Sequence, residues 1–195
     1  MTAPALPTNP PSLSQPKLLT WQEFAALPEP ADGSHHELVK GVVVTMPPPG
    51  FEHGDVQLNV GVLIRAYLKI HDLGRVVTET GVVTQRSPDS VRGPDLVYWS
   101  YERLPRDQRP KVYPENSADL CIEVLSPSNT PKQTLVKLNE YFASGVRMVW
   151  ILDPETRSVS TYRNATEGRI FTENAQLTGE DVLPGFECKV AEFFV

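Results

Sequence analysis

Two short apolar segments each carry one acidic residue, and no other feature constrains the fold as strongly. Asp95 lies in PDLVYWS, at 94–100, and Glu123 lies in DLCIEVLS, at 119–126. Both segments are typical of strands that are covered in the fold, where an unpaired carboxylate costs several kcal/mol. Each carboxylate therefore needs a basic partner, backbone donors or a bound cation.

The alternation of side chains along a strand predicts where the two carboxylates point. Glu123 shares a face with Cys121, and Asp95 shares a face with Val97. If the two strands are neighbours and these faces are aligned, the carboxylates converge on one point. Mg²⁺ is usually held by such a small set of carboxylates, together with water and substrate oxygens. Glu37, at the start of an earlier strand, can add a third oxygen ligand.

A lysine on the next helix is expected to reach the same point. From Glu123 the strand runs about 13 Å to Pro127, and a helix that begins at Pro131 returns about 9 Å to Lys137. A helix packed back along its own strand therefore brings Lys137 nearly level with Glu123. Tyr141 follows four residues later, on the same stripe of the helix. A lysine beside carboxylates and a metal can orient a water molecule or stabilise charge developing on a phosphate.

These residues also fit a purely structural interpretation. Asp95, Glu123 and Lys137 can form an internal salt-bridge network that fixes the register of the strands. His53, at the start of the longest predicted helix, is expected first as a helix residue with a satisfied ring, and second as a catalytic or phosphate-contacting residue. The residues alone leave both interpretations open.

The rest of the chain predicts an α/β (α+β) fold, with a central mixed β-sheet flanked by helices. Residues 1–18 are rich in proline, which predicts a flexible arm that precedes a single domain at 19–195. The segment 75–86 is expected to form one long strand or a hairpin, and the C-terminus is expected to end in a helix. The other expected elements are helices at 20–27, 51–72 and 131–144, a strand or hairpin at 36–46, and strands at 94–100, 119–126, 146–152, 159–163 and 169–172.

Length, cysteine content and charge restrict the class of protein. The chain has 195 residues, with no apolar run near the roughly 20 residues of a membrane span and no signal-peptide pattern, so we expect a cytoplasmic protein without membrane contact. Its two distant cysteines favour neither a disulfide framework nor a zinc cluster. A net charge of −6 disfavours general polyanion binding. The Arg-rich stretch 86–111 is either a mixed-charge loop or a nucleic-acid groove.

The order of the motifs resembles a family of small bacterial proteins known as putative restriction endonucleases, within the PD-(D/E)XK nuclease-like superfamily. The resemblance covers about residues 19–194. It rests on Glu37 in HELVKG, His53 at a helix start, Pro94-Asp95, Glu123 in IEVLSPS, and Lys137 before EYFASGVRMVWILDP.

This resemblance implies a restriction-endonuclease-like core and hydrolysis of DNA phosphodiester bonds that depends on Mg²⁺, or on Mn²⁺ in its place. It implies that Asp95 and Glu123 are metal ligands, that the Val124 carbonyl is a backbone ligand, and that Glu37 is an accessory acidic residue of the catalytic site. A homodimer is expected, because two active sites suit the cleavage of a duplex.

The chain departs from the superfamily motif at one position. Leu125 stands two residues after Glu123, where the motif has a lysine, so the resemblance places the catalytic lysine at Lys137. His53 and Tyr141 are the accessory candidates. Two other functions stay open: a non-catalytic binding or regulatory protein on the nuclease scaffold, and a metal hydrolase that acts on a small phosphorylated molecule.

Overall fold

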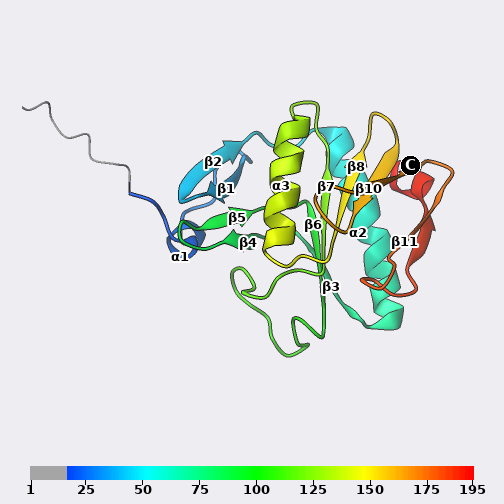
Figure 1. Ribbon diagram of the computed structural model, residues 1–195, viewed down its shortest axis with the longest axis horizontal. Coiled ribbons are helices and arrows are strands. Elements are labelled where there is room, and N and C mark those ends of the chain that lie inside the picture. Colours follow the sequence, from blue (N-terminus) through cyan, green and yellow to red (C-terminus); the bar gives the residue numbers. More distant parts are fainter. Residues whose placement is uncertain (1–16) are drawn as a thin grey trace, which may run out of the picture.

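The described residues fold into two main sheets, a separate two-stranded pair and three α-helices. The computed structural model describes residues 17–195, so most of the predicted arm at 1–18 lies outside the described residues. The helices are α1 (Trp21–Ala25), α2 (Phe51–His71) and α3 (Pro131–Ala143), and a short 3₁₀ helix, η1 (Val190–Phe193), lies near the C-terminus. Figure 1 shows the smaller sheet at one end, beside α1, and α3 in front of the larger sheet.

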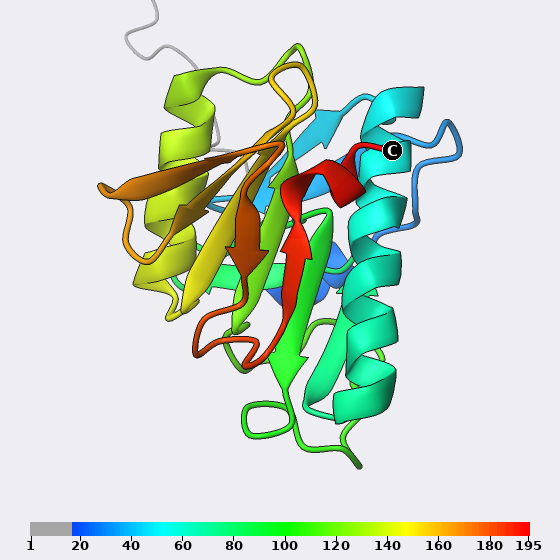
Figure 2. The same ribbon diagram turned by 90° about the vertical axis from the view of Figure 1, so that its right-hand side faces the viewer.

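The larger sheet has six strands in the order β10-β9-β8-β7-β6-β3. Only β7 and β8 pair in parallel, and α3 forms the connection between them. Helix α2 and the C-terminal segment cover one face of this sheet, and α3 covers the other (Figure 2). The expected central mixed sheet flanked by helices is therefore confirmed. Its strands are β3 (Gly74–Thr78), β6 (Leu96–Ser100), β7 (Leu120–Val124), β8 (Met148–Asp153), β9 (Ser158–Tyr162) and β10 (Gly168–Thr172).

The smaller sheet is antiparallel and has the strand order β2-β1-β5-β4. Its strands are β1 (His35–Val39), β2 (Val42–Met46), β4 (Val82–Gln85) and β5 (Ser90–Arg92). The bend predicted at Gly41 is present, because Lys40 and Gly41 both adopt positive φ, 50° and 81°, as a tight two-residue hairpin turn requires. This hairpin places Glu37 in the middle of β1.

The prediction of one strand or hairpin at 75–86 is wrong, because β3 and β4 belong to different sheets. The chain leaves the larger sheet after β3 and turns through Glu79, whose φ is 53°. It passes Gly81, where a Cβ atom would come within 2.6 Å of side-chain atoms of both Val91 and Tyr113. It returns through Gly93 to β6, and this crossing puts Asp95 at the junction of the two sheets.

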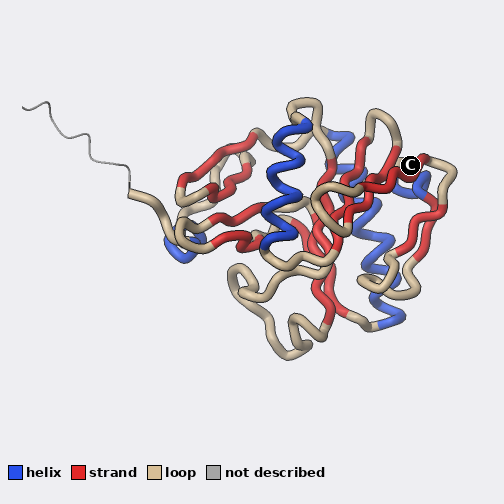
Figure 3. Tube along the Cα trace, in the orientation of Figure 1, coloured by secondary structure: helices blue, strands red, loops and turns tan. Residues whose placement is uncertain are grey.

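The C-terminal segment also differs from the prediction of a terminal helix. It forms the two-stranded pair β11 (Gln176–Thr178) and β12 (Glu187–Lys189), followed by the single turn η1. Three-residue strands such as β5, β11 and β12 are too short to show a periodic pattern of apolar residues. The loop between β6 and β7 is the long tan segment without strands in Figure 3.

The apolar residues form two layers, one on each face of the larger sheet. Alternate residues of β7 point to opposite layers: Ile122 joins the cluster beneath α2, and Cys121 joins the cluster beneath α3. Trp150 on β8 is fully buried in the first layer. Glu123 therefore points toward α3, on the same face as Cys121.

Both cysteines should resist modification in the native protein. Burial holds the pKa of Cys121 well above its ordinary value and raises the pKa of Cys188 to about 12, and only the thiolate reacts rapidly. We expect almost no labelling by an aromatic disulfide reagent in native buffer, and labelling of both thiols in denaturant. Fast labelling of the native protein would contradict the packing of β7 or β12.

Candidate active site

The two strand carboxylates lie beside each other at the junction of the sheets. Strands β6 and β7 are antiparallel neighbours, with Leu96 opposite Ile122 and Val97 opposite Cys121. Continued by one residue, this register sets Asp95 opposite Glu123. The adjacency that the alternation pattern required is therefore present.

Asp95 is held from two directions. Its Oδ1 lies 2.8 Å from Nε2 of His53, and its Oδ2 accepts a 2.6 Å hydrogen bond from the backbone N–H of Val124. Because an ionised carboxylate only accepts hydrogen bonds, Nε2 of His53 carries the proton. The other ring nitrogen, Nδ1, lies 3.0 Å from Oγ of Ser126. His53 thus orients Asp95 from the first turn of α2.

Glu123 faces α3, where it meets the two side chains expected there. The Lys137 ammonium lies 2.9 Å from Oε2 and 3.1 Å from Oε1 of Glu123, and the Tyr141 hydroxyl donates to Oε1 at 2.5 Å. Thr130 caps α3 and Pro131 occupies its first turn, so the helix starts where the estimate of strand and helix rises assumed. That estimate correctly placed Lys137 level with Glu123.

Glu37 joins the group from the smaller sheet. Its Oε1 lies 3.1 Å from the Lys137 ammonium and accepts from the Gly93 N–H at 3.1 Å, while its Oε2 lies 2.6 Å from Arg92. Arg92 in turn binds both oxygens of Glu140 on α3, at 2.5 and 2.9 Å. Glu37 contacts Lys137 rather than Asp95, so it reaches the site through the ammonium.

The pKa values follow from burial and from the balance of charge. Burial raises the pKa of Glu123, and the nearby carboxylates of Asp95 and Glu37 raise it further, against the opposing effect of Lys137. Burial also acts to raise the pKa of Glu37, but Lys137 and Arg92 outweigh it and the net shift is downward. Burial acts to lower the pKa of His53, but its contact with Asp95 prevails and raises it.

The cluster carries an excess of negative charge. Four carboxylates (Glu37, Asp95, Glu123 and Glu140) face two permanent cations (Arg92 and Lys137), which leaves two negative charges uncompensated while His53 is neutral.

A second buried carboxylate in the same molecule has its charge compensated. Asp119 is fully buried and forms ion pairs with two arginines, Arg103 and Arg147. It also accepts a hydrogen bond from the backbone N–H of Ser100. Arg147 also pairs with Asp181 at 2.8 Å, so the charges around Asp119 balance, as expected of a structural ion-pair network, and those around Asp95 and Glu123 do not.

The donor set fits a hard divalent cation. In the described part of the chain no three His, Cys, Asp or Glu side chains are close enough to hold a metal by themselves. Mg²⁺, however, commonly takes only one or two carboxylates and completes its shell with water and phosphate oxygens. With two acceptor positions on each carboxylate oxygen, the bonds to residues 17–195 leave a position free on both oxygens of Asp95 and on Oε2 of Glu123. The side chains of Asp95 and Glu123 are 17% and 12% exposed, so solvent reaches them.

A small cavity adjoins the Glu123–Lys137 pair. Its volume of about 30 Å³ is enough for a water molecule. Leu125, Gln133 and Tyr141 are among the residues that line it. The cavity therefore offers a place for water next to the Lys137 ammonium.

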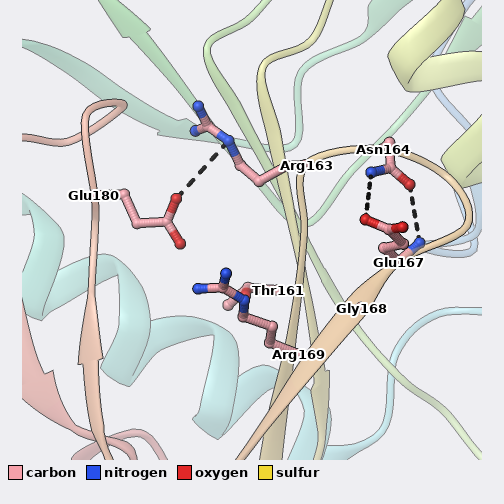
Figure 4. Close-up of a pocket in the computed structure, with 7 residues that line it drawn as sticks. All are labelled: Thr161, Arg163, Asn164, Glu167, Gly168, Arg169 and Glu180. Atoms are coloured by element: carbon pink, nitrogen blue, oxygen red, sulfur yellow. Dashed lines mark hydrogen bonds and ion pairs between the residues drawn. The ribbon is translucent and has the colours of Figure 1, made fainter.

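A larger pocket lies away from this cluster, on the β9–β10 hairpin. It measures about 140 Å³ and is lined by Arg163, Arg169 and Glu180, among others (Figure 4). Arg163 is paired with Glu180 and with Asp181. The pocket is two strands away from β7, so it does not belong to the candidate site.

Several site residues escaped the sequence analysis. Arg92 and Glu140 form the outer ion pair, and Gln57 on α2 donates both to the Asp95 carbonyl and to Glu79, each at 2.9 Å. Glu79 also pairs with His35 at 2.9 Å. Gln57 is buried at a helix position where the spacing predicts an apolar residue. A polar residue at such a position is the sequence signal that could have identified Gln57 as a site residue.

The Arg-rich stretch 86–111 is mostly committed to internal pairs. Arg92 is buried against Glu37 and Glu140, and Arg103 donates to three backbone carbonyls and forms an ion pair with Asp119. Arg106 pairs with Asp72. The interpretation of this stretch as a nucleic-acid groove is therefore wrong for Arg92 and Arg103, because their guanidinium groups are already used inside the fold.

Comparisons with known proteins agree on the kind of fold. A family model described as "Uma2: Putative restriction endonuclease" matches residues 21–191. The structure resembles a crystal structure of a putative nuclease belonging to DUF820 from Anabaena variabilis ATCC 29413. The TM-score is 0.76 and the identity 23%, over 90% of this chain and 97% of the other. A search of curated proteins gave no match. Within residues 17–195, no helix combines the length and apolarity needed to cross a membrane.

The excess of negative charge makes a prediction about stability without metal. Lys137→Met removes one of two cations and leaves Glu123 and Glu37 underpaired, so it should lower the free energy of unfolding by about 3 kcal/mol. Glu123→Gln removes a surplus charge and should change it by less than about 1 kcal/mol. Urea unfolding in the presence of a chelator measures both values. Equal losses in the two variants would instead indicate a closed structural ion pair.

Proposed function

The chain belongs to the Uma2 family of putative restriction endonucleases, and from this membership we propose that it is a Mg²⁺-dependent endonuclease that hydrolyses DNA phosphodiester bonds. One observation carries the proposal. Asp95, one residue before β6, lies beside Glu123 of the neighbouring strand β7, and the Lys137 ammonium lies 2.9 Å from Glu123, within a group that holds more negative than positive charge.

We assign the metal to the oxygens at the junction of the sheets. Asp95 and Glu123 are the side-chain ligands, and the carbonyl of Val124 is the backbone ligand. Mn²⁺ can replace Mg²⁺ because both prefer oxygen ligands. When bound, the cation supplies positive charge that polarises the scissile phosphate. His53 is an accessory residue that fixes the orientation of Asp95 through its 2.8 Å contact.

Lys137 is the catalytic cation of the proposal. Its ammonium adjoins the small cavity beside Glu123, where it can hold a water molecule in place and stabilise the charge that develops on the phosphate. Glu37 is an accessory acidic residue whose Oε1 lies 3.1 Å from the same ammonium. Tyr141 donates to Glu123 and restrains that carboxylate. The ammonium is thus held between two carboxylates from different sheets.

The second candidate is a non-catalytic binding or regulatory protein on the same scaffold. It is favoured by the engagement of both Glu123 oxygens with Lys137 and Tyr141, and by a net charge of −6 that disfavours nucleic acid. Calorimetry separates the candidates. The endonuclease should bind Mg²⁺ or Mn²⁺ with millimolar or tighter affinity, and Asp95→Asn should abolish this binding.

Nicking of supercoiled plasmid DNA tests the proposed chemistry. Asp95→Asn, Glu123→Gln and Lys137→Met should each lower the Mg²⁺-dependent rate by about 100-fold or more, because each removes a charge that acts on the phosphate or the cation. Lys132→Met is the matched control, since Lys132 is exposed on the same helix and should keep the full rate.

Two outcomes would reject the endonuclease. One is plasmid cleavage that survives both Asp95→Asn and Lys137→Met, which would point to a contaminant. The other is a folded protein that binds metal but cleaves neither double-stranded nor single-stranded DNA. Circular dichroism shows whether each variant is folded, so that loss of activity is not confused with loss of structure.

A further inference from the structure

The outer face of α2 has a pattern that packing within the chain does not explain. The inner face contributes Val56, Val60, Ile64 and Leu68 to the core. The opposite face is exposed along the whole helix. It presents residues at alternating spacings of four and three, which we name the heptad stripe: Phe51, Asp55, Leu58, Val62, Arg65 and Lys69. This spacing is the one by which two helices pack along each other at a small crossing angle.

The heptad stripe combines unusual apolar exposure with unpaired charge. Phe51, Leu58 and Val62 are 92%, 63% and 56% exposed, although an isolated surface helix favours polar residues at such positions. Within residues 17–195, Asp55, Arg65 and Lys69 form neither a salt bridge nor a side-chain hydrogen bond. The stripe thus has an apolar centre, an acid toward the N-terminal end and two bases toward the C-terminal end.

We propose that this stripe binds the same stripe of a second copy of the chain, with the two α2 helices antiparallel. A twofold axis midway between Leu58 and Val62 pairs each residue with one equally far on the other side of the axis. Leu58 then meets Val62 of the second copy, and Asp55 meets Arg65 of the second copy. Phe51 meets the aliphatic stem of Lys69, a favourable contact for both side chains. Each of these three contacts occurs twice, once on either side of the axis, as a twofold interface requires.

The charge distribution excludes the other arrangement of two copies. A parallel pair in register would set Asp55 against Asp55 and Arg65 against Arg65, and like charges opposed across an interface are strongly unfavourable. An unrelated partner helix would need this same charge order in reverse, whereas a second copy supplies it by symmetry. Self-complementarity is therefore the argument for a second copy of this chain as the occupant.

The position of the stripe is compatible with the candidate active site. His53 and Gln57 contact Asp95 from the inner face of α2, so pairing along the outer face leaves that site uncovered. Figure 2 shows α2 at one side of the molecule, with the loop between α1 and β1 near its upper end. Ala66, Ile70 and the C-terminal Val195 are exposed and enlarge the surface. Asn59 binds the carbonyl of Val195 at 3.2 Å, which ties this residue to the same side of the helix.

Sedimentation velocity across the micromolar range tests the proposal. We expect the unaltered chain to form a dimer. Asp55→Lys should weaken it by at least about 10-fold, because the new lysine faces Arg65 of the second copy on both sides of the axis. The double variant Asp55→Arg with Arg65→Asp restores opposite charges and should return the affinity to within about threefold of the original. Glu155→Lys is the matched control, an equal change of charge on the exposed β8–β9 turn, and should leave the dimer intact.

Three results would overturn the proposal: a monomer at all concentrations, a dimer that Asp55→Lys leaves unchanged, or a double variant no stronger than Asp55→Lys alone. The positions are exposed, so every variant should fold, and urea unfolding verifies this independently of association. Mixing Leu58→Cys with Val62→Cys chains gives a second measurement. A disulfide should form between the two kinds of chain in preference to chains of the same kind. The native Cys121 and Cys188 are buried and do not compete.

Discussion

The shortage of positive charge around Asp95 and Glu123 is the constraint on which the rest of this molecule depends. Glu123 lies on a covered strand and Asp95 directly precedes another, yet among residues 17–195 only Lys137 and Arg92 supply permanent positive charge nearby. The fold meets this demand by bringing α3 back along β7, and by placing β1 and β5 of the smaller sheet against α3. The arrangement of the two sheets therefore determines which charged side chains can meet in the ion network.

The network joins elements that hydrophobic packing alone would leave loosely related. Glu37 belongs to the smaller sheet, Glu123 to the larger sheet and Lys137 to α3, and the ammonium contacts both carboxylates. Removal of one charge therefore weakens the attachment of the smaller sheet and α3 to the larger sheet, in addition to breaking one contact. Asp119 provides the internal comparison, because its two arginines stabilise a single strand end and show how a purely structural carboxylate is compensated in this chain.

The inner part of the site was predictable from the sequence, and the outer part was not. Asp95, Glu123 and Lys137 could be placed together because strand alternation and the rises of strand and helix are regular over such short distances. Arg92, Glu140 and Glu79 could not be placed, because their contacts depend on how the smaller sheet meets the larger one. The contact between the two sheets depends on β4 and β5, which are too short to show a periodic pattern of apolar residues. It also depends on the crossing of the chain through Glu79 and Gly81, whose sequence is indistinguishable from that of an ordinary bend.

Helix α2 takes part in both the candidate active site and the proposed dimer, because its inner face contacts Asp95 and its outer face carries the heptad stripe. Its inner face carries the apolar residues of the core and, in the first two turns, His53 and Gln57, which contact Asp95. A helix of 21 residues spans about 32 Å, far more than is needed to deliver His53. The additional turns bury Ile64 and Leu68, and on the outside they extend the heptad stripe to Lys69. In an antiparallel pair the two His53 residues would lie about 21 Å apart along the helix axes. Both sites of a dimer would then be held at a fixed separation by the same helices that orient their carboxylates.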